Sequence, residues 1–387
     1  MEIEENNNAQ PPYSAKHPWL LICHGDVMDK QTFFSVSENR YYMKNIPELK
    51  EKMLYAYADE WLVLGSIDSN DCCYLWNFIS NKKIQLPPLP AKCDILNCLL
   101  SAPPHDPECL VIFQIKETLD DDDTDDDDDE NKNSTDTNNK DEDENENTNN
   151  KDEDENDNTN NKDEDENENS DEDSNEDEDE DDEDMNRLTF YFCKPGYNTE
   201  FHKQDVQSII GDPRLGRWTV FKKKIYALMG MQDILICLDV DNESGRITAT
   251  PMANESPEES RKFSDHPCYT DFIIQSSCND MLLYVHLISN GRNYRMPYHF
   301  RVLQFDFVRK RWIKAESIGE IAIFISLNAA TTCSTKGTNL NKESIYFTDD
   351  RYLYIYDLIT QSMSLSLPCP HVSKRKGRDI HWLTLSQ

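Results

Sequence analysis

The chain repeats a short pattern in which a strand ends at an Asn or Asp and an apolar residue follows six to eight positions later. The pattern occurs at Asn77 with Ile84, Asp239 with Ile247, Asp306 with Trp312, and Asp357 with Met363. An Asn or Asp at such a place bonds to its own backbone and starts a turn, so each copy predicts a β-hairpin. Because a single hairpin buries too little surface to be stable, the hairpins must pack on one another.

The segment from Ser344 to Pro370 shows the pattern in full. Apolar side chains alternate with polar ones through three short runs, and Asp-rich or Ser/Thr-rich turns separate the runs. This alternation predicts three antiparallel strands. Since radial packing is a common arrangement of repeated hairpins, the sequence predicts an all-β fold, a single β-propeller of six blades, with seven as the alternative. The lone strand predicted over 379–385 can join the amino-terminal hairpin and close the ring.

An acidic segment interrupts this pattern. From Asp120 to Asp184 the sequence holds 38 Asp and Glu against 4 Lys, a net charge of −34, which leaves about −2 for the rest of the chain. Thr-Asn-Asn-Lys-Asp-Glu-Asp-Glu-Asn occurs three times in it, without an apolar residue that could form a helical seam. We interpret residues 119–186 as a disordered acidic insert in the loop of one hairpin, where a longer loop costs little closure entropy.

The domain organisation follows from these segments. Residues 1–16 are predicted to be a disordered leader, and residues 17–387 to form the propeller that the insert interrupts. No signal peptide or long apolar run is evident, which argues against export and against a membrane partner. The nearly neutral propeller argues against nucleic-acid binding, which needs clustered Lys and Arg.

The sequence assigns no catalytic, cofactor-binding or metal-binding residue. No CxxC pair, HExxH helix, G-x-S-x-G elbow or Gly-rich phosphate loop occurs, and the histidines are scattered. Asp239, Asp306 and Asp357 are explained by their predicted turns, so we expect a protein that is not an enzyme and uses no cofactor. Twelve cysteines without metal spacing predict reduced, mostly buried thiols and a cytoplasmic and/or nuclear location.

Tryptophans and one basic cluster have structural and functional interpretations. Trp61, Trp218, Trp312 and Trp382 lie in predicted strands, where they are expected to anchor blades; binding a partner is the alternative. Lys374, Arg375, Lys376 and Arg378 form a basic cluster that fits either a solvated loop or a nuclear import signal.

Four segments resemble a known family. The segments 61–90, LTFYFCKPGY from Leu188, VLQFDFVRKRWIKAESIGEIAIF from Val302 and SIYFTDD from Ser344 are similar, in this order, to the plant β-propeller family found in many F-box proteins and long catalogued as a domain of unknown function. The resemblance implies a propeller that recognises a protein to be ubiquitinated, while an F-box docks on the Skp1 adaptor. Only about 17 residues precede the first predicted strand, too few for a three-helix F-box.

Two functions remain open at this stage. The first is a protein-interaction propeller that resembles the substrate-recognition domain of F-box ubiquitin-ligase receptors, with a Skp1-type adaptor as partner only if an F-box is joined to it. The alternative is an acidic scaffold or chaperone that binds basic proteins through the polyanion of residues 120–184.

Overall fold

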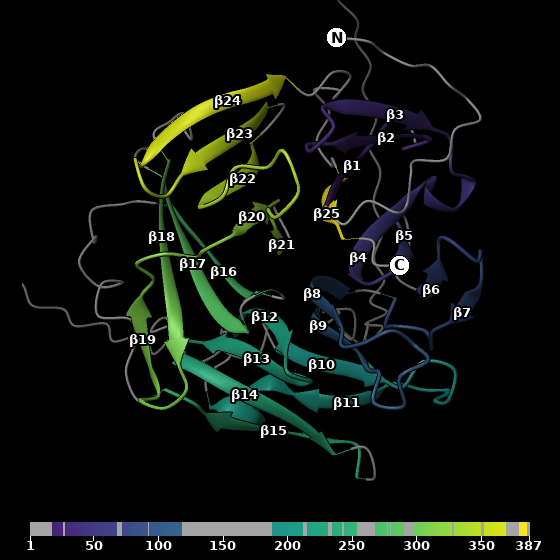
Figure 1. Ribbon diagram of the computed structural model, residues 1–387. Coiled ribbons are helices and arrows are strands. Elements are labelled where there is room, and N and C mark those ends of the chain that lie inside the picture. Colours follow the sequence, from purple (N-terminus) through teal and green to yellow (C-terminus); the bar gives the residue numbers. More distant parts are fainter. Residues whose placement is uncertain are drawn as a thin grey trace, which may run out of the picture. The chain divides into compact units, whose positions relative to one another are not determined.

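The computed structural model describes residues 18–25, 28–67, 72–91, 93–117, 188–211, 215–230, 234–241, 244–253, 268–276, 278, 280–289, 298–326, 329–349, 352–368 and 379–384. The predicted leader, the acidic insert and the basic cluster at 374–378 lie outside these residues. The described residues form six sheets arranged in a ring (Figure 1). The predicted six-bladed, all-β propeller is therefore confirmed.

The strands of the first three blades are as follows. Blade 1 contains β25 (Asp379–Leu383), β1 (Trp19–His24), β2 (Lys30–Ser35) and β3 (Arg40–Lys44). Blade 2 contains β4 (Lys52–Ala58), β5 (Trp61–Ser66), β6 (Tyr74–Asn77) and β7 (Lys83–Gln85), after the short 3-10 helix η1 (Pro47–Leu49). Blade 3 contains β8 (Cys93–Leu100), β9 (Val111–Glu117), β10 (Leu188–Cys193) and β11 (His202–Asp205).

The other three blades complete the ring. Blade 4 follows the one-turn helix α1 (Val206–Ile210) and contains β12 (Leu215–Phe221), β13 (Lys224–Met229), β14 (Ile234–Asp241) and β15 (Arg246–Pro251). Blade 5 contains β16 (Cys268–Ser276), β17 (Met281–Ser289), β18 (Tyr298–Asp306) and β19 (Arg311–Lys314). Blade 6 has five strands: β20 (Ile321–Ile325), β21 (Ala330–Ser334), β22 (Ser344–Asp349), β23 (Tyr352–Asp357) and β24 (Ser362–Pro368).

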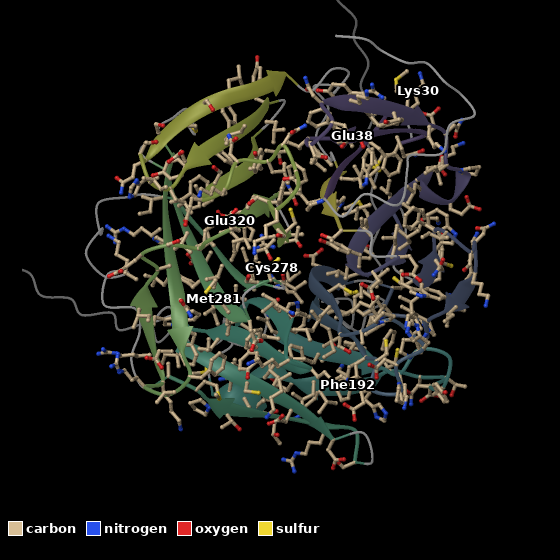
Figure 2. All side chains as sticks on the ribbon, viewed as in Figure 1. Lys30, Glu38, Phe192, Cys278, Met281 and Glu320 are labelled. Atoms are coloured by element: carbon tan, nitrogen blue, oxygen red, sulfur yellow. The ribbon has the colours of Figure 1, made fainter. Side chains whose placement is uncertain are left out.

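The hydrophobic core is divided among the contacts between blades. Six clusters of buried side chains occur among the described residues, one between each pair of neighbouring blades. Figure 2 shows side chains filling the spaces between the sheets. Strand residues alternate between the two faces of a blade, so one face packs on the preceding blade and the other on the following blade. Trp61, Trp218, Trp312 and Trp382 all belong to or pack against these clusters, as predicted.

The last strand closes the ring. β25 pairs antiparallel with β1, from Trp19 opposite Leu383 to Cys23 opposite Asp379, so the two ends of the chain share blade 1. Trp382 is completely buried there, its indole N–H donates to the Ile325 carbonyl oxygen of blade 6 at 3.0 Å, and its ring packs edge-on against Phe324. The predicted closure by a carboxyl-terminal strand is confirmed.

The acidic segment follows β9 and precedes β10, which pair with each other from Lys116 opposite Leu188 to Val111 opposite Cys193. The residues on either side of it are therefore neighbours in one antiparallel hairpin. Blade 3 keeps its four strands despite the interruption.

Blade 6 departs from the simple hairpin repeat. The predicted strands of the 344–370 segment are present as β22, β23 and β24, but β22 pairs with β20 in parallel. The inner strand of blade 6, β21, also runs in the opposite direction to the inner strands of the other blades, as two contacts show. Thr331, at the start of β21, lies beside Thr384, which follows β25, with their hydroxyl oxygens 3.2 Å apart. Thr332 of β21 donates to the carbonyl oxygen of Gln275, near the end of β16.

This reversal defines two faces of the ring. The inner strands β25, β4, β8, β12 and β16 all end on one face of the ring. We call this face the end face and the opposite face the start face. Lys222 and Lys223, which follow β12, form ion pairs with Asp280 after β16 and Asp106 after β8, which places all three turns on the end face. Because the strand directions alternate outward, the β18–β19 turn also lies on the end face. The β23–β24 turn lies on the start face.

We predict that Trp382→Ala destabilises the protein by about 3–5 kcal/mol, because the change removes a buried indole that joins blades 1 and 6. Urea unfolding followed by circular dichroism measures the change. Tyr197→Ala is the matched control, since this aromatic residue is 75% exposed and should cost little. A loss below about 1 kcal/mol for Trp382→Ala would contradict the role given to ring closure.

Candidate functional site

The predicted turn residues occupy two kinds of position. Asn77, Asp306 and Asp357 each end a strand and accept hydrogen bonds from the backbone N–H groups two and three residues later, at 2.7–3.1 Å. The bond from the Arg309 N–H is the main cause of the lowered pKa of Asp306, and the bond from the Thr360 N–H is the main cause of the lowered pKa of Asp357. The prediction for Asp239 is wrong: it lies inside β14, opposite Thr248, and Asp241 ends the strand.

The three turns present apolar side chains to solvent. Ile79 is 51% exposed, Val308 93% and Ile359 72%, each two residues after the capping Asn or Asp. Ile79 and Val308 lie on the end face, whereas the reversed direction of blade 6 puts Ile359 on the start face. The backbone bonds to the Asn or Asp hold each turn in one shape, so these side chains are presented rigidly.

Blades 4 and 5 build a larger surface around Val308. Phe307 stacks on Phe221 with ring centroids 5.5 Å apart, and thereby joins the β18–β19 turn to the β12–β13 turn of the neighbouring blade. The β12–β13 turn holds Lys222 and Lys223 at φ values of 51° and 63°, a conformation that Asn and Gly adopt far more readily. We call Lys222, Lys223, Phe307, Val308 and Arg309 the blade 4–5 surface.

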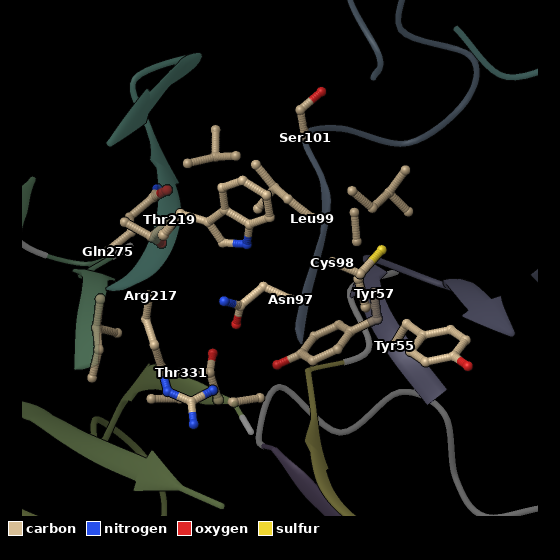
Figure 3. Close-up of a pocket in the computed structure, with 18 of the residues that line it drawn as sticks. Tyr55, Tyr57, Asn97, Cys98, Leu99, Ser101, Arg217, Thr219, Gln275 and Thr331 are labelled. Carbon is tan, nitrogen blue, oxygen red and sulfur yellow. The ribbon is translucent and has the colours of Figure 1, made fainter. Parts of the chain in front are cut away.

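A cavity of about 730 Å³ lies along the axis of the ring. Its lining comes from the inner strands of all six blades, β25, β4, β8, β12, β16 and β21. Figure 3 shows Tyr57, Asn97, Arg217 and Thr331 reaching toward one another from four different blades. We call this cavity the channel.

Three consecutive blades carry a bulge in the strand that lines the channel. The pairing register shifts between Leu54 and Ala56 in β4, between Ile95 and Asn97 in β8, and between Leu215 and Trp218 in β12. A bulge re-aims the side chains around it and is frequent beside functional sites. In β8 and β12 the bulges lie next to Asn97 and Arg217.

Two polar side chains that line the channel, Asn97 and Arg217, have contacts within the described structure. The Asn97 side-chain amide donates to Gln114 Oε1 at 2.8 Å. The Arg217 guanidinium carbon lies 5.0 Å from the centroid of the Phe272 ring, a cation–π distance. Burial lowers the pKa of Arg217, while the nearby Asp271 carboxylate opposes this shift.

A Tyr–Asp–His cluster lies in blade 5, next to the channel wall. Tyr284 donates its hydroxyl proton to Asp271 Oδ1 at 2.9 Å, and His286 Nδ1 contacts the same oxygen. Asp271 and His286 lie opposite each other on β16 and β17. Asp271 does not line the cavity, so this cluster supports the wall rather than the open space.

Four of the described thiols are buried and weakly acidic. Burial raises the pKa of Cys73, Cys109, Cys193 and Cys333 to about 12. Cys109, Cys193 and Cys333 form no disulfide. Among the described residues no group of three or more His, Cys, Asp or Glu lies together as a metal site would require. No helix within the described part of the chain is long and apolar enough to cross a bilayer.

The comparison with protein families identifies the fold. The KIB1-4 β-propeller family model matches residues 33–120 and 181–365, well over half of the chain. The chain belongs to the KIB1-4 β-propeller family. This match confirms the resemblance found in the sequence, and it passes over residues 121–180, so the acidic segment is additional to what the family model describes.

Other comparisons add little to the family match. No curated protein is similar to the chain. A solved structure titled dihydro-heme d1 dehydrogenase NirN in complex with DHE has 8% sequence identity and a TM-score of 0.33, covering 97% of this chain and 77% of that one. A likeness this weak carries no argument about function.

The channel was not predicted, and no site residue was assigned from the sequence. The residues that line the channel come from segments scattered between Met53 and Thr384, so no local pattern indicates them. The turn residues were found because an Asx turn has a local signal. The stacking of Phe307 on another blade has none.

Tyr57 provides a test of how the channel is held together. Burial raises its pKa above the ordinary value of 10.0, whereas hydrogen bonds with Thr331 and Thr384 act in the opposite direction. Since the folded pKa exceeds the unfolded one, Tyr57 contributes stability that is present below pH 10 and is lost as the pH rises through the folded value.

Tyr57→Phe should cost about 1 kcal/mol at pH 7, through the lost hydrogen bonds, and should make stability fall less steeply above pH 10. Denaturant unfolding at a series of pH values measures both effects. Tyr352→Phe is the control, because this residue is 40% exposed and outside the channel. An unchanged alkaline slope in Tyr57→Phe would show that the hydroxyl is not buried as described.

Proposed function

We propose that this propeller is a protein-recognition domain without catalytic activity, and that it binds its target through the blade 4–5 surface. The observation that carries the proposal is Val308, which is 93% exposed at the tip of a turn whose backbone is fixed by two hydrogen bonds to Asp306 at 2.9 and 3.0 Å. An exposed branched side chain on a rigid turn contributes nothing to the fold and loses little entropy when a partner covers it.

The composition of this surface also supports recognition of a protein. Aromatic residues and Arg are enriched at binding hot spots, and Phe307 and Arg309 flank Val308. Lys222 and Lys223 add positive charge nearby, although each forms an exposed ion pair that is worth little in water. The left-handed conformation of these two lysines costs free energy, and strained backbone of this kind is concentrated at functional sites.

We further propose that the target is a substrate of a ubiquitin ligase, since the family resembles the propellers of F-box receptors. A Skp1-type adaptor would then bind only through an F-box joined to this domain. The buried, weakly acidic thiols support a location in the cytoplasm and/or nucleus, where thiols stay reduced. Nucleic acid, membrane and cofactors are not part of the proposal.

A pair of matched variants tests the surface. Val308→Asp should abolish recovery of the target in affinity purification from cells of the source organism, with wild-type protein as reference. Ile359→Asp is the control, because it occupies the same kind of turn but lies on the start face. Equal losses in both variants, or none in Val308→Asp, would contradict the assignment; circular dichroism confirms that both remain folded.

The acidic scaffold remains the alternative function, favoured by the net charge of −34 over residues 120–184. Replacing residues 118–186 by Asn-Gly would leave the β9–β10 hairpin able to form. On the recognition proposal, this variant keeps the target that Val308→Asp loses. Loss of binding to core histones with retention of the fold would instead support the scaffold, provided that 150 mM salt does not already abolish binding by the intact chain.

A further inference from the structure

The two turns that build the blade 4–5 surface carry an excess of positive charge. Six exposed basic side chains lie on or beside these turns: Lys222, Lys223, Lys224, Arg309, Lys310 and Arg311. The first four form ion pairs with the carboxylates of Asp280, Asp106, Asp239 and Asp306, in the same order. Lys310 and Arg311 form no ion pair with the residues that the structure describes. Positive charge therefore exceeds negative charge here, whereas the chain outside residues 120–184 has a net charge of about −2.

The existing ion pairs leave the cations accessible to a partner. Each paired Lys or Arg is more than half exposed, and an ion pair between exposed side chains contributes little free energy because water screens it. A carboxylate supplied by a partner can therefore replace Asp280 on Lys222, or Asp106 on Lys223, with little loss. Asp306 stays in place, because it also accepts the two backbone hydrogen bonds of its own turn.

Apolar side chains lie among these charges. Val308 is 93% exposed and Phe307 is 36% exposed. Phe307 rests on three rings of blades 4 and 5, with centroids 4.9–5.9 Å from its own, those of Phe221, Tyr226 and Phe305. A partner that offered only charge would leave Val308 in water, whereas an apolar side chain of a partner would cover it. The surface thus favours a partner that combines the two properties.

We propose that the blade 4–5 surface binds a segment of the target protein in which Asp or Glu residues flank a large apolar side chain. The inference rests on the proposed function and names the chemistry of its target. The apolar side chain lies against Val308 and Phe307, and the carboxylates lie toward Lys310, Arg311 and Lys223. Residues 120–184 of the chain itself are acidic but contain no apolar residue, so they lack this chemistry. Opposite charges on the two partners also speed their encounter.

Selection from a random peptide library displayed on phage tests the proposal. The full chain and its Val308→Asp variant are used in parallel, at about 150 mM salt, so that weak charge attraction is screened. We expect the peptides that only the wild type enriches to carry Asp or Glu on both sides of a large apolar residue. Absence of any peptide that depends on Val308 would overturn the proposed function and this inference together. Peptides that depend on Val308 but have no acidic excess would overturn this inference alone.

Fluorescence anisotropy with one selected peptide, made synthetically, measures the contribution of charge. Lys310→Gln together with Arg311→Gln should weaken binding about tenfold, because both unpaired cations are lost. Lys336→Gln together with Lys342→Gln is the matched control, since these two exposed lysines follow β21 on the start face, and it should bind as the wild type does. Unchanged binding by the Lys310 and Arg311 variant would overturn the proposal; circular dichroism confirms that both variants are folded.

A second peptide separates charge from apolar contact. It copies residues 163–174 of the acidic segment, which carry Asp and Glu but no apolar side chain. We expect it to bind at least about tenfold more weakly than the selected peptide, because it leaves Val308 uncovered. Equal binding of the two peptides would show that charge alone is recognised, and would overturn the proposal. Binding of a duplex DNA more tightly than the selected peptide would do the same.

Discussion

Burial of both faces of every blade is the constraint on which the rest of the structure depends. A four-stranded sheet with two apolar faces cannot exist alone in water, and the ring gives each face a neighbouring sheet. Six blades require six contacts, and each has its own cluster of buried residues. β25, which comes from the opposite end of the chain to β1, contributes Trp382 to the contact between blades 6 and 1 and Leu383 to the contact between blades 1 and 2. Pairing with β1 also removes the edge that either terminal strand would expose.

Blade 6 shows that this constraint concerns faces rather than strand direction. Its inner strand runs opposite to the other five, and β20 and β22 pair in parallel. The cluster with blade 5 nevertheless joins Ile323 of β20 and Ile345 of β22 to Phe272 and Val285. Hydrophobic packing has no direction, so a reversed blade satisfies its neighbours as well as a regular one does. The reversal changes where the turns lie. Asp306 and Asp357 have the same local chemistry but lie on opposite faces, so neighbouring blades present similar turns on opposite sides of the ring.

The elements that could be predicted from the sequence are those whose pattern lies within a short stretch of the chain. Outer hairpins were predictable because apolar alternation and an Asx turn lie within a few residues of each other. The inner strands β4 and β21, and the short outer strand β11, were not predicted. β21, which lines the channel, reads Ala-Thr-Thr-Cys-Ser and has no apolar alternation, and the bulge at Tyr55 breaks the alternation of β4. Asp239 was misplaced because β14 continues for two residues beyond it. The channel combines short stretches from six blades, and no spacing in the sequence records that combination.

The acidic segment is joined to the propeller on the start face. β8 ends on the end face, so its antiparallel partner β9 ends on the start face, and the segment follows Glu117 there. Val308 lies on the end face, and the hydroxyl cluster around Tyr57 is near the same end of the channel. Glu117 itself is held in blade 3, where it accepts hydrogen bonds from Tyr191 at 2.7 Å and from Lys203 at 2.8 Å. These contacts fix the last residue before the segment on the sheet, so the hairpin does not need the segment in order to close. The described part of blade 3 is therefore complete without any contribution from the acidic segment.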